Sequence, residues 1–228
     1  MKNELYMRQR PITVADHHQV LEPWAELRRQ LSQPPAVLCL DYHTDILSCH
    51  TRDIPLPADG AWRDRETVSR AIAGLRHDEH FDWALRSGTI SKAVIVSLTA
   101  PATTPAHPAI EVRHAAALPE PEVILNQPES FRATADRLLH DSFLQPLTAD
   151  IDMDREPWIL DIDCDFFLTA AATDFSADSR FAALARQAAL VTLSQETVWV
   201  RLLRLPGETI TGESLADMLT DRLSRLRA

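Results

Sequence analysis

The chain has 228 residues, 45% of them hydrophobic, and a formal net charge of −10. This length allows one sizeable core but is short for two, so we expect a single domain spanning residues 1–228. The negative charge disfavours nucleic acid as a partner, and the apolar runs are too short to cross a membrane, so we expect a cytoplasmic protein. Three cysteines without metal-knuckle spacing argue against a disulfide framework and a structural zinc site.

The first half of the chain predicts helices alternating with buried strands. Residues 20–31 have helical periodicity, and the segment QPP at 33–35 ends that helix. The apolar run AVLCL at 36–40 then predicts a buried strand. A second helix is expected at 64–75, and KAVIVSL at 92–98 predicts the next strand.

The second half repeats the alternation after a Pro-rich connection at 101–128, which contains one short edge strand, EVRH. The expected elements are helices at 130–142, 177–189 and 213–226 and strands at 157–163 and 189–194. Residues 196–205 are ambiguous between strand and helix. Alternating helices and continuously apolar strands predict an α/β fold of three layers, α/β/α, with a mostly parallel sheet covered on both faces.

Two acidic motifs follow apolar strands directly. Asp41, His43 and Asp45 stand at alternate positions, which share one face in extended backbone and can therefore converge on one point. Asp161 and Asp163 repeat this arrangement at the end of the strand at 157–163. Ligand sites in open α/β sheets lie beyond the carboxyl ends of the strands, where both motifs are expected.

Carboxylates gathered at the ends of buried strands repel each other and are costly to desolvate, and bound cations remove both penalties. His17, in Asp16-His17-His18, could supply a further imidazole, with His18 as the alternative. The four carboxylates and two imidazoles would balance two divalent ions. Oxygen ligands with some imidazole suit Mn²⁺, while zinc, iron and cobalt remain open. We leave Asp165 outside the ligand set, as an orienting group or a helix N-cap.

The first motif alone would also fit a solvated turn, and the second acidic motif is what favours a metal site. Among the other histidines, His50 and His80 are the best candidates for a proton shuttle, although surface or packing positions are the commoner alternative for each.

These residues resemble the ureohydrolases, the arginase and agmatinase superfamily. The segment 41–45 is similar to that family's Asp-x-His-x-Asp signature, and 161–163 to its later Asp-x-Asp signature. Asp16-His17 is similar to the Gly-Gly-Asp-His segment without its two glycines. A closer match is a branch of arginase-like proteins with Asp-His-His near the start and Leu-Asp-Ile-Asp-x-Asp-Phe-Phe late in the chain. That branch includes peptide arginases, which convert arginine side chains of ribosomally made peptides into ornithine.

The resemblance extends to 191–196, which is similar to the branch's Thr-Ile-Ala-x-Ser-Pro-Glu segment with Gln195 in place of the proline. By that match Glu196 binds the guanidinium, with Glu208 as the competing acid. The resemblance implies an arginase-like domain with two Mn²⁺ ions, which lower the pKa of a water between them. It also implies hydrolysis of arginine residues in a precursor peptide to ornithine and urea, with an aspartate such as Asp45 passing a proton to the leaving nitrogen.

Three other functions stay open at this point. A small-molecule ureohydrolase would act on free arginine or agmatine, and a deacetylase on a related scaffold would use a single zinc held by Asp, His and Asp. A non-enzymatic peptide-binding module would keep the metal for stability alone. Neither the substrate nor the oligomeric state follows from these patterns.

Overall fold

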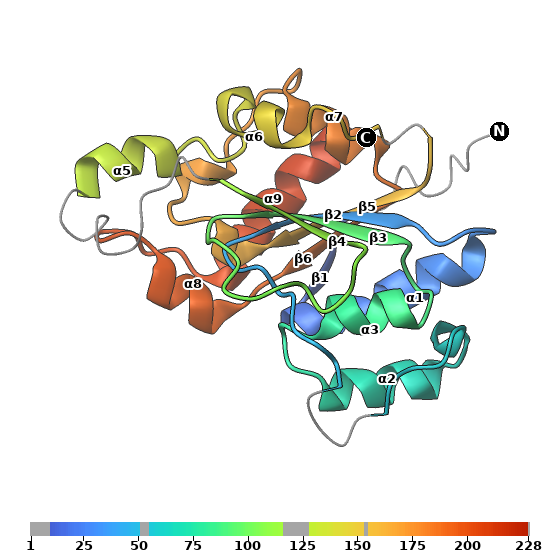
Figure 1. The fold of residues 1–228 in the computed structure, drawn as a ribbon. Helices are drawn as coiled ribbons and strands as arrows, with labels where there is room; N and C mark the ends of the chain where they lie inside the picture. The colour runs from blue at the N-terminus through green and yellow to red at the C-terminus, as the bar shows by residue number, and fades with distance from the viewer. Residues whose placement is uncertain (1–9, 51–54, 116–127, 153–154, 228) are drawn as a thin grey trace.

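The computed structural model describes residues 10–50, 55–115, 128–152 and 155–227. Its centre is a six-stranded sheet in the order β1-β6-β5-β2-β3-β4, in which every pairing is parallel. The strands are β1 (Ile12–Val14), β2 (Ala36–Asp41), β3 (Lys92–Ser97), β4 (Ile110–His114), β5 (Trp158–Asp163) and β6 (Leu190–Ser194). Figure 1 shows this sheet lying between two groups of helices.

Helices cover both faces of the sheet, because the strands expose apolar side chains on each. One face packs against α1 (Leu21–Gln30), α2 (Arg65–Gly74) and α3 (His80–Arg86). The other packs against α5 (Pro128–Ala135), α6 (Asp141–Thr148), α7 (Arg180–Gln187), α8 (Thr197–Leu203) and α9 (Gly212–Arg227). In β2 the alternation is direct, since Leu38 and Leu40 belong to one core and Val37 and Cys39 to the other. The expected three-layer α/β/α fold is confirmed.

The long apolar runs were placed correctly by their sequence pattern. The strands expected at 36–40, 92–98, 157–163 and 189–194 correspond to β2, β3, β5 and β6. The segment EVRH belongs to β4, which lies at one edge of the sheet as expected. The ambiguous stretch at 196–205 forms a helix, α8.

The single helix expected at 130–142 is wrong, because the chain forms α5 and α6 with a turn between them. His140 has extended backbone at φ −76° and ψ 153° and precedes α6. Leu138 and Leu139 are fully buried in that turn, so apolar spacing continues where the helix does not. Two short elements, β1 and α3, were missed. Residues 116–127 of the expected Pro-rich connection lie outside the described residues.

Every helix within the described ranges falls short of the length and hydropathy needed to cross a membrane.

Candidate metal centre

The two acidic motifs meet because β2 and β5 are neighbours in register. Leu40 lies opposite Ile162, so the next residues, Asp41 and Asp163, end their strands side by side at the carboxyl edge of the sheet. Both are buried. The strand pattern therefore places two carboxylates at one point on the face of the sheet that carries α1.

His17 reaches this point from the start of the chain. Beyond β1, the N–H of Glu196 donates to the Ala15 carbonyl at 3.0 Å, which continues the pairing of β1 with β6. The His17 N–H donates to Glu196 Oε1 at 2.7 Å. A 3₁₀ turn, His17–Val20, begins here and leads into α1, with the His17 side chain fully buried.

The His17 ring lies among four carboxylates. Its Nδ1 is 2.9 Å from Asp45 Oδ2, 3.1 Å from Asp163 Oδ2 and 3.6 Å from Asp41 Oδ2. Its Nε2 is 2.7 Å from Asp161 Oδ2. A ring N–H satisfies one acceptor at a time, so three carboxylates facing Nδ1 have more charge than His17 can neutralise.

The electrostatics of the cluster lead to the same conclusion. Burial raises the pKa of Asp41 well above its usual value, and repulsion from Asp45, Asp165 and Asp163 raises it further. Burial and then repulsion from Asp165 likewise raise the pKa of Asp163. Burial acts to lower the pKa of His17, but attraction to Asp161 and Asp163 outweighs it and raises that pKa. The cluster is an anionic pocket that favours cations.

Asp165, which the spacing argument left out of the ligand set, faces the same point. Its Oδ1 accepts the Tyr42 N–H at 3.2 Å, and Asp41 Oδ1 accepts the His43 N–H at 2.7 Å. The second oxygen of each, Oδ2, is buried without a hydrogen bond. His43 Nδ1 lies 2.9 Å from Asp165 Oδ2, and the two form an ion pair when the ring is protonated. A bound cation would satisfy Asp41 Oδ2 and replace the His43 ring proton at Asp165 Oδ2.

Asp161 is different, because both of its oxygens are already engaged. Oδ2 faces His17 Nε2, and Oδ1 accepts the Thr192 hydroxyl at 2.5 Å. The structure therefore separates the two aspartates of the second motif. Asp163 faces the open side of the His17 ring, and Asp161 lies behind it.

The donors fit divalent metal ions. Among the described residues, three groups have ligand atoms that all lie within 4.8 Å of one another, namely His17 with Cys39 and Asp41, His17 with Asp45 and His80, and Asp41 with His43 and Asp165. Carboxylate oxygens and imidazole nitrogens dominate, which suits manganese, zinc, iron or cobalt. The Cys39 thiol is fully buried, and burial raises its pKa well above the usual value, so it is a weak donor here.

Glu196 lies on the rim between the cluster and α8. Its side chain is 7% exposed, and burial raises its pKa although the His17 N–H acts to lower it. Trp199, one turn into α8, contacts the His43 ring with centroids 4.9 Å apart. Among the described residues, the non-glycine positions with positive φ are Glu196 at 39° and Asp45 at 46°. Such backbone costs about 1–3 kcal/mol and is concentrated at functional sites.

The two proton-shuttle candidates differ in position. His80 is fully buried against the His17 ring, with centroids 4.4 Å apart, and its Nδ1 lies 4.0 Å from Asp45 Oδ2. His50 is exposed and belongs to none of the ligand groups. Glu208, the competitor of Glu196, accepts hydrogen bonds from Arg132 Nη1 at 2.5 Å and from the Ala170 N–H at 3.1 Å. Both of its oxygens are engaged, which favours a structural role.

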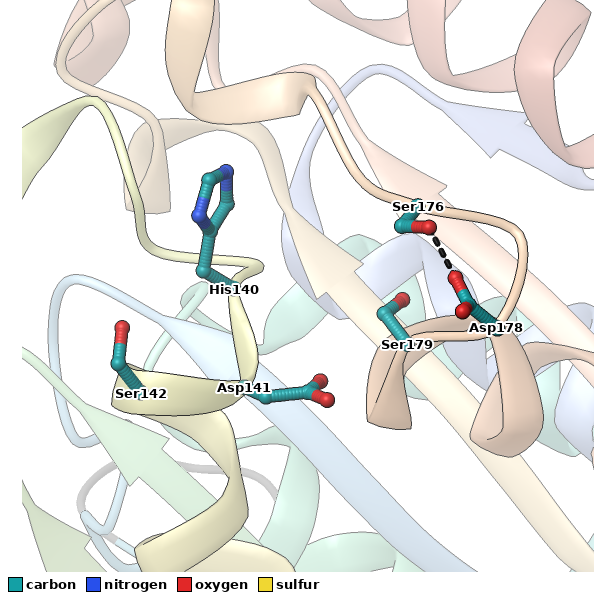
Figure 2. Close-up of a pocket in the computed structure, with 6 residues that line it drawn as sticks. All are labelled: His140, Asp141, Ser142, Ser176, Asp178 and Ser179. Carbon is teal, nitrogen blue, oxygen red and sulfur yellow. Dashed lines mark hydrogen bonds between the residues drawn. The ribbon is translucent and has the colours of Figure 1, made fainter.

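A separate polar cavity of about 330 Å³ lies at the N-terminal ends of α6 and α7 (Figure 2). It is lined by His140, Asp141, Ser142, Ser176, Asp178 and Ser179. Asp141 Oδ1 accepts the Arg180 N–H at 2.7 Å, and Ser179 Oγ accepts the Ala182 N–H at 3.2 Å. These groups cap α7, so the cavity is explained by helix capping.

No family profile and no curated protein matches this chain. Among solved structures, it is similar to proclavaminate amidino hydrolase from Streptomyces clavuligerus, with 14% identity and a TM-score of 0.47 over 94% of this chain and 63% of that one. It is also similar to a hypothetical agmatinase from Burkholderia thailandensis, with 16% identity and a TM-score of 0.49 over 94% of this chain and 58% of that one. The chain thus spans about three fifths of the length of each.

Proposed function

We propose that the chain is a two-metal hydrolase that converts arginine residues of a precursor peptide into ornithine, releasing urea. The observation that carries the proposal is the buried cluster around His17 Nδ1. Three carboxylates face this one ring nitrogen, which can donate only one proton. Its ligands would be Asp41, Asp45, Asp163 and Asp165 with His17 and His43. The four carboxylates balance two divalent ions in formal charge.

Two divalent ions held by these residues would supply the nucleophile, because metal ions lower the pKa of bound water. Glu196 would hold the guanidinium by charge-assisted hydrogen bonds, since its carboxylate is at the rim and, among the described residues, only its Oε1 accepts a hydrogen bond, from the His17 N–H. The partly exposed Trp199 ring beside His43 offers a face on which a planar guanidinium can stack. Asp45 would carry the proton to the leaving nitrogen.

A peptide substrate is supported by the surface next to Glu196. Val198 and Leu202 stand one turn apart on α8, and each is 68% exposed. Neighbouring exposed apolar side chains beside a site are typical of surfaces that bind a partner or ligand. They would contact residues that flank the arginine.

The test is to purify the protein with Mn²⁺ and offer free arginine, agmatine and an arginine-containing peptide in parallel, measuring urea and peptide mass. Urea together with ornithine in the peptide is the expected result. Urea from a free small molecule alone would replace the peptide substrate with a metabolic one. Bound metal without urea from any of the three would refute guanidino hydrolysis on these substrates and favour a deacetylase or a binding module.

A further inference from the structure

A chain of hydrogen bonds extends from α1 across β6 and β5, on the face of the sheet that carries α1, to His17. Trp24 Nε1 donates to Thr192 Oγ1 at 3.2 Å, and Thr192 Oγ1 donates to Asp161 Oδ1 at 2.5 Å. Asp161 Oδ2 then lies 2.7 Å from His17 Nε2. All four side chains are fully buried, so water does not compete for these bonds.

The direction of this chain is fixed by its first member. An indole N–H can only donate, so Thr192 Oγ1 must accept from Trp24. The single hydroxyl proton of Thr192 is then directed at Asp161 Oδ1. The hydroxyl thereby holds the Asp161 carboxyl group so that its other oxygen, Oδ2, points at His17 Nε2. A metal ion bound at Nδ1 would take the lone pair of that nitrogen, so the ring proton would lie on Nε2 and be donated to Asp161 Oδ2.

We infer that Trp24 and Thr192 are positioning residues that set the tautomer of His17 through Asp161. Nε2 keeps its proton, and Nδ1 is left as the atom that binds metal. Nδ1 is the nitrogen that faces Asp41, Asp45 and Asp163, so the tautomer and the orientation of the ring agree. This inference rests on the metal centre proposed above, and it adds two residues that lie outside the ligand set.

The effect should appear in metal affinity, because groups that orient a ligand histidine typically change affinity about 10- to 100-fold. The measurement is a titration of the chelator-stripped protein with Mn²⁺, with visible absorption after Co²⁺ substitution as a second readout. Thr192→Val keeps the shape of the side chain and removes the hydroxyl. We expect it to weaken one of two Mn²⁺ sites about 10- to 100-fold and to change the Co²⁺ spectrum.

Two comparisons separate tautomer control from general damage. Thr192→Ser restores the hydroxyl and should restore both affinity and spectrum. Thr148→Val removes another fully buried hydroxyl, which donates to the Leu144 carbonyl at 2.8 Å, and should leave both unchanged. Wild-type affinity in Thr192→Val, or equal loss in Thr192→Ser, would overturn the inference. If Thr192→Val does not fold, Trp24→Phe in the same titration decides, with weakened binding expected.

The inference and the proposed function fail in different ways. Two bound Mn²⁺ ions that depend on the Thr192 hydroxyl, without urea from any substrate, would refute the function and support the inference. Urea release together with an Mn²⁺ affinity that does not depend on Thr192 would support the function and refute the inference. A wild-type protein that binds no metal would refute both.

Discussion

The candidate metal centre and the capping cavity both combine aspartates with histidine, and they differ in whether the carboxylate oxygens have hydrogen-bond partners. At the ends of β2 and β5, Asp41 and Asp165 each keep a buried oxygen without a hydrogen bond. In the cavity of Figure 2, Asp141 is exposed and caps α7, and a hydrogen bond from Ser176 lowers the pKa of the exposed Asp178. Acidic composition is common to both, so bare buried oxygens are the better sign of a metal centre.

The largest effect should come from Asp163→Asn, which removes a carboxylate facing His17 Nδ1. Metal analysis should show loss of bound Mn²⁺, and urea release should fall by roughly 10³-fold, because a metal centre contributes several kcal/mol to the transition state. Asp178→Asn is the control from the capping cavity and should change neither. Unchanged metal content in Asp163→Asn would reject Asp163 as a ligand.

Removing the metal should come next in size. A chelator should lower the melting temperature by about 5–10 °C relative to protein with Mn²⁺ at 100 times its Kd, because binding at that level adds about 2.7 kcal/mol of stability. Differential scanning calorimetry measures the shift. Asp163→Asn should show little or no Mn²⁺-dependent shift. A wild-type melting temperature that does not change with Mn²⁺ would argue against a metal centre.

Glu196→Gln should reduce kcat/KM about 10- to 100-fold with the metals still bound, because a charge-assisted hydrogen bond to the guanidinium is weakened. Glutamine keeps the oxygen that accepts the His17 N–H, so the fold at the rim is retained. Glu208→Gln is the matched control, since Glu208 already pairs with Arg132. Loss of turnover in Glu208→Gln but not in Glu196→Gln would assign guanidinium binding to Glu208 instead.

The smallest effect is expected from the capping cavity itself. Ser179→Ala removes the side-chain acceptor of the Ala182 N–H and should cost about 1 kcal/mol of unfolding free energy. Thermal unfolding gives this value. Metal content and urea release should stay at wild-type levels, and a drop in metal content would mean that the two clusters are coupled.

Sequence patterns predicted the parts of this fold that depend on long apolar runs. β2, β3, β5 and β6 are continuous hydrophobic segments, and their order implied a covered parallel sheet. β1 was missed because three residues are too few for a period. α3 was missed because its buried face includes His80 and Asp82, which read as polar.

For the candidate metal centre, the sequence predicted the strands that carry the aspartates but not which of the aspartates face the same point. Spacing by two residues fits Asp161 with Asp163 and Asp163 with Asp165 equally well, so the sequence alone could not separate them. Strand register does separate them, because it places Asp163 beside Asp41 and leaves Asp161 behind the His17 ring. The oxygens of Asp161 are occupied by side chains from other elements, which a linear pattern does not reveal.

The bond between His17 and Glu196 joins residues 179 positions apart. During translation, the N-terminal strand β1 must therefore wait for β6, its partner at the far end of the chain, before it can join the sheet. The nascent protein can form β2 and β3 early, but the cluster stays open until Glu196 has been synthesised. A ribosome-stalled fragment that ends before β6 should therefore bind Mn²⁺ poorly, because β1 cannot yet hold His17 beside the other residues of the proposed metal centre.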